Sequence, residues 1–247
     1  MDEKRQGWST VHGQWFIAHS EFAIVYGLRS VNNNDYNMIK KIVVIGPEST
    51  GKSTLCEQLA QRFSTTWCPE YAREYLRCNG VKYGYDDLLK ITQGQLAAED
   101  YYIEKVSGEW SMASAEERMV NRESLNMNCQ TQGINSPLTT HHSLLFIDTN
   151  MYVMKVWYEY VFGKCEQLVL DEASKRKYDL YLLCNIDLPW IADEMREYPD
   201  EQPRIELYNI YKDILINQAT PWIEISGNYE ERLQKAADAV EKYCVIQ

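Results

Sequence analysis

Short runs of apolar residues alternate along most of the chain with longer segments in which apolar residues recur every three or four positions. The short runs predict strands, and the longer segments predict helices that pack through one face. The predicted strands are 41–45, 65–68, 144–148, 181–184 and 222–226; the predicted helices are 52–63, 70–76, 86–105, one through 153–161, 204–217 and 229–243. This alternation indicates an α/β fold with a central parallel sheet of about five strands and helices on both faces.

Three segments depart from this alternation. Residues 1–37 end in a polar linker and are interpreted as a loosely ordered N-terminal extension of a domain at 38–247. The alternative is a docking segment whose aromatic residues pack on the domain or on a partner. Residues 107–141 are rich in Ser, Asn, Gln and Thr, which predicts a polar insertion or disordered loop. Residues 187–204 combine prolines with many charges.

The composition limits the classes of function. A formal net charge of −11 without a basic block argues against a nucleic-acid partner. The seven cysteines are scattered without a C-x-x-C pair, so they suggest neither a disulfide framework nor a zinc site and indicate a cytoplasmic protein. No apolar run approaches the ~20 residues that span a bilayer, and no membrane partner is expected.

Residues 46–54 form a phosphate-binding loop between the first predicted strand and the first predicted helix. Loop N–H groups and the helix N-terminus bind phosphate, Lys52 is expected to bridge the β- and γ-phosphates, and Ser53 to ligate Mg²⁺. The predicted nucleotide-binding residues are Gly46, Pro47, Glu48, Ser49, Thr50, Gly51, Lys52, Ser53 and Thr54. Together with the predicted sheet, this loop indicates a P-loop kinase-type three-layer sandwich.

Two further groups lie at the ends of predicted strands. Asp148 follows four apolar residues, as in a Walker B strand, and is interpreted as a Mg²⁺ partner or proton acceptor. The alternative is an ordinary strand-end residue that helps to cap the next helix. Glu70 and Arg73 fall three positions apart after Pro69, and their types fit either a surface ion pair or contacts with sugar and phosphate.

The charged segment 187–204 is interpreted as a lid, because phosphoryl transfer needs cations near the moving phosphate and the exclusion of water. Arg196 and Arg204 would supply the cations. The alternative is a charged loop in which both arginines pair with neighbouring glutamates. No N-K-x-D sequence follows the fourth predicted strand, so ATP is favoured over GTP.

Several motifs, in this order, resemble the ribosylnicotinamide kinase domain of NadR-type proteins. They are the loop and Leu55, Pro69-Glu-Tyr-Ala-Arg-Glu-Tyr75, Asp148-Thr149 with Val156-Trp157, Asp179-Leu-Tyr-Leu-Leu183 with Asp187-Leu-Pro-Trp190, and Ser226-Gly-Asn-Tyr-Glu-Glu-Arg232. The resemblance covers residues 38–243 apart from the insertion. It implies ATP- and Mg²⁺-dependent phosphorylation of the 5′-hydroxyl of nicotinamide riboside, which gives nicotinamide mononucleotide in NAD salvage.

The resemblance also implies roles for individual residues. Acceptor-binding residues would be Glu70, Arg73, Asp187 and Trp190; catalytic residues Lys52, Asp148, Arg196 and Arg204; and metal ligands Ser53 and Asp148. NadR-type proteins also carry an adenylyltransferase domain, which does not fit in 37 residues, so a kinase-only chain is expected. The insertion could reshape substrate access or form a homo-oligomer contact. Two alternatives stay open: a kinase of another nucleoside or small metabolite, and an ATP-binding sensor with little turnover.

Overall fold

The computed structural model describes residues 39–107, 143–192 and 200–245, and everything below refers to them. The expectations for the extension 1–37, for nearly all of the insertion 107–141 and for Arg196 lie outside these residues. Among the described helices, none is both long enough and apolar enough to cross a membrane.

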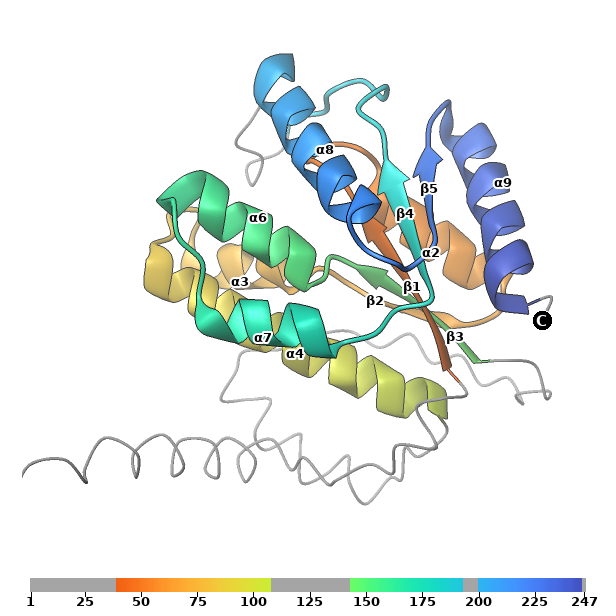
Figure 1. Cartoon of the computed structure of the whole chain (residues 1–247), viewed down its shortest axis with the longest axis horizontal. Coiled ribbons are helices and arrows are strands. Elements are labelled where there is room, and N and C mark those ends of the chain that lie inside the picture. Colours follow the sequence, from red (N-terminus) through yellow and green to blue (C-terminus); the bar gives the residue numbers. More distant parts are fainter. Residues whose placement is uncertain (1–38, 108–142, 193–199, 246–247) are drawn as a thin grey trace, which may run out of the picture. The chain divides into compact units, whose positions relative to one another are not determined.

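A five-stranded parallel sheet forms the centre of the fold, as predicted (Figure 1). The strands are β1 (Ile39–Ile45), β2 (Thr66–Cys68), β3 (Ser143–Asp148), β4 (Leu180–Cys184) and β5 (Trp222–Ile225), in the order β2-β3-β1-β4-β5. The register pairs Val44 with Asp148, and Cys68 with Ile147. The carboxyl ends of β1, β2 and β3 therefore lie together at one edge of the sheet, from which the loops that follow them emerge.

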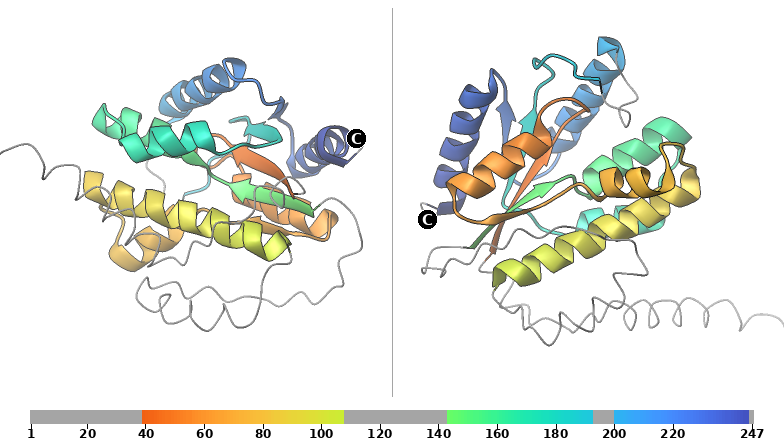
Figure 2. Two further views of the ribbon diagram at one scale, coloured as in Figure 1. Left: turned by 60° about the horizontal axis from the view of Figure 1, so that its bottom comes forward. Right: turned by 180° about the vertical axis from the view of Figure 1, so that it is seen from behind.

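Helices cover both faces of the sheet, so the predicted three-layer sandwich is confirmed (Figures 1 and 2). One face carries α2 (Lys52–Arg62) and α9 (Tyr229–Val240), and the other carries α4 (Tyr85–Ser107), α6 (Met151–Phe162) and α8 (Glu201–Ile216). Alternate residues of β1 pack against the two helical layers, because successive side chains of a strand point to opposite faces of the sheet. Ile42 and Val44 pack with α2 and α9, whereas Val43 and Ile45 pack with the other layer.

A third apolar cluster lies away from the sheet, where α3 (Tyr71–Asn79) and α7 (Gln167–Lys175) pack with α4 and α6. The sequence pattern did not predict α7. Val169 is its one buried residue, and a short helix with so small an apolar face leaves little periodic signal. The last helix also differs from the prediction, since its α-helical part ends at Val240 and a π-helical turn, η2 (Glu241–Val245), follows.

A buried ionic cluster joins α4 to the other end of the sheet. The Glu99 carboxylate, fully buried on α4, lies 3.2 Å from Arg176 and 3.9 Å from Lys41, and accepts a hydrogen bond of 3.0 Å from the Tyr178 hydroxyl. Burial lowers the pKa of Lys41. Charges removed from water in this way are stable only while they remain paired, so this cluster ties α4 to β1 and to the segment before β4.

Candidate active site

The phosphate loop connects β1 to α2 in a conformation that requires its two glycines. Gly46 has φ 146°, and a Cβ there would lie 2.7 Å from the Cys184 carbonyl oxygen. Gly51 has φ 77° and precedes the first residue of α2, and its position supplies no side-chain hydrogen bond to the N–H groups at that helix end. Exposed helix N–H groups and the helix dipole attract anions. The loop is therefore built as a phosphate site.

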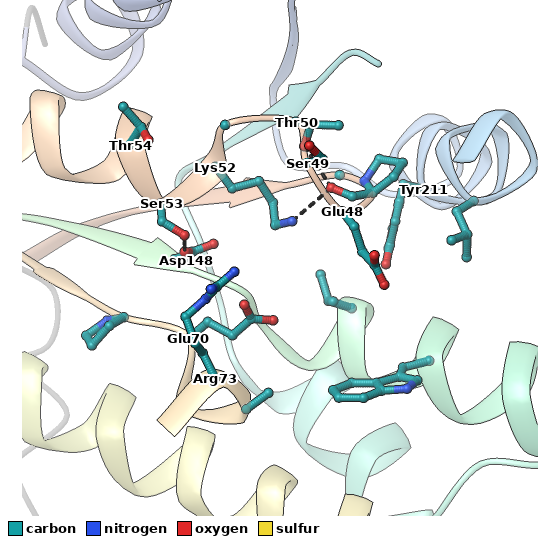
Figure 3. Close-up of a pocket in the computed structure, with 18 of the residues that line it drawn as sticks. Glu48, Ser49, Thr50, Lys52, Ser53, Thr54, Glu70, Arg73, Asp148 and Tyr211 are labelled. Atoms are coloured by element: carbon teal, nitrogen blue, oxygen red, sulfur yellow. Dashed lines mark hydrogen bonds between the residues drawn. The ribbon is translucent and has the colours of Figure 1, made fainter. Parts of the chain in front are cut away.

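The Lys52 side chain folds back over this loop. Its Nζ donates a 2.9 Å hydrogen bond to the Pro47 carbonyl oxygen, which also accepts a 2.8 Å bond from the Thr50 hydroxyl. Figure 3 shows the lysine reaching along the loop above Glu70 and Arg73. An ammonium in this place can neutralise a phosphate that enters the loop.

Asp148 and Ser53 form the best candidate for a metal site. Ser53 Oγ donates a 2.5 Å hydrogen bond to Asp148 Oδ2, while the other carboxylate oxygen is buried without a hydrogen-bond partner among the described residues. Burial first, and the Glu70 charge second, raise the pKa of Asp148 to about 6. A hydroxyl beside an incompletely satisfied carboxylate is the oxygen-rich set that Mg²⁺ prefers, so these residues fit the ion.

One cavity of about 370 Å³ opens beside the phosphate loop (Figure 3). Besides Gly46–Thr54 it is lined by Trp67, Pro69, Glu70, Ala72, Arg73, Leu76, Asp148, Val153, Trp157, Tyr160, Val161, Leu207 and Tyr211. Its far wall is thus apolar and aromatic, and comes from α3, α6 and α8. Such a wall suits a flat organic group held next to the phosphates.

Hydrogen bonds and charges give this cavity a definite chemistry. The indole N–H of Trp157 donates a 2.8 Å bond to the Tyr83 hydroxyl, which fixes the ring that faces the cavity. Burial, followed by the charges of Glu70 and Glu48, raises the pKa of the Tyr211 hydroxyl, so Tyr211 is neutral at physiological pH. Glu48 and Glu70 bring negative charge to the cavity, and Lys52 and Arg73 bring positive charge to it.

The structure brings together most of the predicted site residues. All nine residues of the loop, together with Glu70, Arg73 and Asp148, line the cavity. Asp187 and Trp190 do not line it, and Arg204 does not either. The predicted acceptor contacts of Asp187 and Trp190 therefore stay predictions without support from the geometry.

Arg204 belongs to the beginning of α8 rather than to a loop. Its guanidinium lies over the Trp190 ring, 5.2 Å from the ring centre, and only 6% of the residue is exposed. Its Nε and Nη1 have no hydrogen-bond partner within the described part of the chain.

Arg232 is a structural residue of the site to which the sequence analysis gave no role. This α9 side chain is 3% exposed and donates to the carbonyl oxygens of Thr50 (3.0 Å), Asn185 (2.9 Å) and Gly227 (2.7 Å). It also pairs with Asp187, whose other carboxylate oxygen accepts a 2.6 Å bond from the Gly227 N–H. The phosphate loop is thereby tied to the loops after β4 and β5. The available signal was that Arg232 shares a helix face with Ala236 and Ala239, four and seven positions further on.

A glycine loop after the first strand, together with a carboxylate at the end of the neighbouring strand, defines the P-loop NTPase class of domain. The chain belongs to the AAA domain family, whose sequence profile matches residues 41–232.

Sequence comparison relates the chain to NadR proteins. The chain is 22% identical over 209 residues to the trifunctional NAD biosynthesis/regulator protein NadR of Escherichia coli K12, and 21% identical to that of Salmonella typhimurium. Each alignment covers 83% of this chain and 42% of the relative. The resemblance to NadR-type proteins is confirmed, and the chain spans less than half the length of these relatives.

Solved structures of NadR proteins share the fold. A NadR protein in complex with NR superposes with a TM-score of 0.59 at 23% identity, over 85% of this chain and 50% of that one. A NadR protein in complex with NAD and AMP-PNP gives a TM-score of 0.57 at 21% identity, over 95% of this chain and 58% of the other. At this level of identity the likeness establishes the fold.

Proposed function

We propose that this chain is an ATP- and Mg²⁺-dependent kinase that phosphorylates the 5′-hydroxyl of nicotinamide riboside to give nicotinamide mononucleotide, in cytoplasmic NAD salvage. The observation that carries the proposal is the single cavity in which the phosphate loop and Asp148 meet an acidic, aromatic wall. Phosphoryl donor and acceptor must lie side by side, and this cavity offers surfaces suited to both.

The loop side fits the phosphates of ATP. The α2 N-terminus and the loop N–H groups bind the phosphates, and Lys52 exchanges its bond to Pro47 for one to phosphate. Ser53 and Asp148 would hold Mg²⁺, which neutralises charge on the phosphates when bound. The NadR protein solved with AMP-PNP, an ATP analogue, supports the choice of nucleotide.

The opposite side fits the acceptor. Nicotinamide riboside carries a flat pyridinium ring with a positive charge, and a cation over an aromatic face gains ~0.5–2 kcal/mol. Trp157, Tyr160 and Tyr211 supply aromatic surface, while Glu48 and Glu70 supply the opposite charge. The NadR protein solved with NR supports this acceptor.

The chain's own residues then perform the transfer. Glu48, Glu70 and Asp148 are the carboxylates that line the cavity. Because Asp148 would hold Mg²⁺, we assign Glu70 as the group that receives the proton of the acceptor hydroxyl. Lys52 and Arg73 balance the negative charge of the moving phosphoryl group. The roles of Arg204 and Arg196 as cations near the phosphates stay predictions, since Arg204 lies in α8 outside the cavity and Arg196 lies outside the described residues.

The test is ADP release with four acceptors: nicotinamide riboside, its reduced and uncharged form, nicotinic acid riboside and cytidine. Nicotinamide riboside should show the highest kcat/KM, at least ~10-fold above the uncharged form, since one neutralised charge is worth about 1.4 kcal/mol. Lys52→Ala should abolish turnover. Equal use of the charged and uncharged forms would refute charge recognition. ATP binding without turnover of any acceptor would refute a kinase and favour a sensor.

A further inference from the structure

Outside the cavity, two consecutive residues of α4, Gly94 and Gln95, contact the elements that carry both key carboxylates. Gln95 is 1% exposed, and neither residue lines the cavity. The P-loop chemistry does not require either one. A fully buried amide needs hydrogen-bond partners. Those of Gln95 come from three other segments of the chain: a 3.7 Å contact of Nε2 with Cys68 Sγ on β2, and two shorter bonds to the residues that follow the carboxylates.

The first partner is the beginning of α3. Gln95 Oε1 accepts a 2.8 Å hydrogen bond from the N–H of Tyr71, the residue directly after Glu70. The Tyr71 ring lies against Gly94, where a Cβ would come within 2.0 Å of a ring carbon. Glycine disfavours a helix interior, and its use here is explained by this close approach. Gln95 thus binds the backbone N–H of Tyr71, and Gly94 leaves room for its ring.

The second partner is the turn after β3. Gln95 Nε2 donates a 3.1 Å hydrogen bond to the carbonyl oxygen of Thr149, the residue directly after Asp148. Thr149 has φ 80°, in the left-handed region that a β-branched residue avoids. Such a conformation persists only where the surroundings enforce it. The Gln95 amide provides part of that constraint.

We propose that Gly94 and Gln95 are positioning residues that set the placement of Glu70 relative to Asp148. The Gln95 amide is hydrogen-bonded to the residue after each carboxylate. Its oxygen accepts from the N–H of Tyr71, which follows Glu70, and its NH₂ group donates to the carbonyl oxygen of Thr149, which follows Asp148. An apolar side chain of similar size provides neither bond. This inference rests on the proposed function, because it assigns the acceptor carboxylate and the metal carboxylate to one reaction.

The main test compares Gln95→Met with Thr92→Val in the full chain. Thr92 is a matched control, because it is also fully buried on α4 but its hydroxyl donates within the helix, to the Leu88 carbonyl oxygen at 2.8 Å. Gln95→Met should lower kcat/KM for nicotinamide riboside about 10- to 100-fold, the loss expected for reacting groups displaced by ~1 Å. Affinity for AMP-PNP without Mg²⁺ should stay within about 2-fold, because Gln95 does not contact the phosphate loop.

A second variant tests the other contact. Gly94→Ala should lower kcat/KM for the riboside in the wild-type background and have little effect in a Tyr71→Ala background, since the ring with which the methyl collides is then absent. This pair keeps the proposal testable if Gln95→Met does not fold. Equal losses in both backgrounds, or kinetics of Gln95→Met that match those of Thr92→Val, would overturn the proposal.

A readout without an acceptor separates this proposal from the proposed function. Mg²⁺ should increase the affinity for AMP-PNP in the wild type, and Gln95→Met should reduce that increase by displacing Asp148. If the wild type does not phosphorylate the riboside but Gln95→Met still loses the Mg²⁺ effect, the positioning role stands and the acceptor is wrong. An unchanged Mg²⁺ effect would overturn the positioning of Asp148.

Discussion

Replacing Arg232 with methionine should weaken both the fold and the binding of ATP. Methionine fills a similar volume, but it donates no hydrogen bonds. The change leaves the carbonyl oxygens of Thr50, Asn185 and Gly227 without this donor and removes the cation from Asp187. Because Thr50 belongs to the phosphate loop, a disturbance of stability and a disturbance of nucleotide binding should occur together.

The size of the effect follows from burial. Breaking a buried ion pair by removing one partner costs about 3–5 kcal/mol. Arg232 is 3% exposed, but Asp187 is 36% exposed and can regain water, so we expect the low end of that range. About 3 kcal/mol corresponds to a fall in Tm of roughly 6–12 °C for a domain of this size. The freed loop should lose about 10-fold in affinity for AMP-PNP, or ~1.4 kcal/mol.

Thermal unfolding with and without AMP-PNP measures both quantities. Lys235→Met is the matched control, because it removes one positive charge from the exposed face of the same helix. Arg232→Lys should recover only part of the loss, since an ammonium keeps the charge but lacks the planar fork that reaches several carbonyls. A variant that unfolds early but binds AMP-PNP with unchanged affinity would refute the link between Arg232 and the loop.

Two further predictions concern buried charges. The folded-state pKa of Asp148, about 6, lies above its ordinary value of 3.8, so the folded protein without metal holds a proton that the unfolded chain loses. The free energy of unfolding should fall by up to ~3 kcal/mol as pH rises from about 4 to about 6. The fall should be smaller in Asp148→Asn, and urea unfolding that depends on pH in the same way for both proteins would contradict this. Arg176→Met leaves the Glu99 carboxylate buried with Lys41 at 3.9 Å. It should cost about 3–5 kcal/mol in urea unfolding without changing KM for the riboside, and an undiminished stability would show that the cluster is dispensable.

Local signals explain what the sequence could predict. The strands were found because each is a short apolar run, and the phosphate loop because its motif is contiguous. Asp148 was found because a carboxylate directly follows such a run. The helix α7 escaped detection because only Val169 of that helix is fully buried. Where burial is small, periodicity carries little information.

Contacts over long separations explain what the sequence could not predict. Asp187 and Arg232 pair across 45 positions, and Gln95 bonds to Thr149 across 54. Neither pairing leaves a pattern in the sequence. Trp157 and Tyr211 face the cavity only because of how α6 and α8 are rotated against the sheet. The side chains of one helix can be predicted to share a face, but the neighbour of that face depends on the packing of the whole domain.

The two faces of the sheet contribute different parts of the site. The helix that begins at the phosphate loop and the helix that carries Arg232 lie on one face, while α6 and α8, which supply much of the aromatic wall, lie on the other. Residues of the wall can therefore change without disturbing the layer that supports the phosphate loop. Under the proposed function, a directed-evolution library confined to Trp157, Tyr160 and Tyr211 should change the acceptor while leaving the affinity for AMP-PNP unchanged. If the proposed function is correct, the domain combines an acceptor pocket that can vary with a fixed site for ATP.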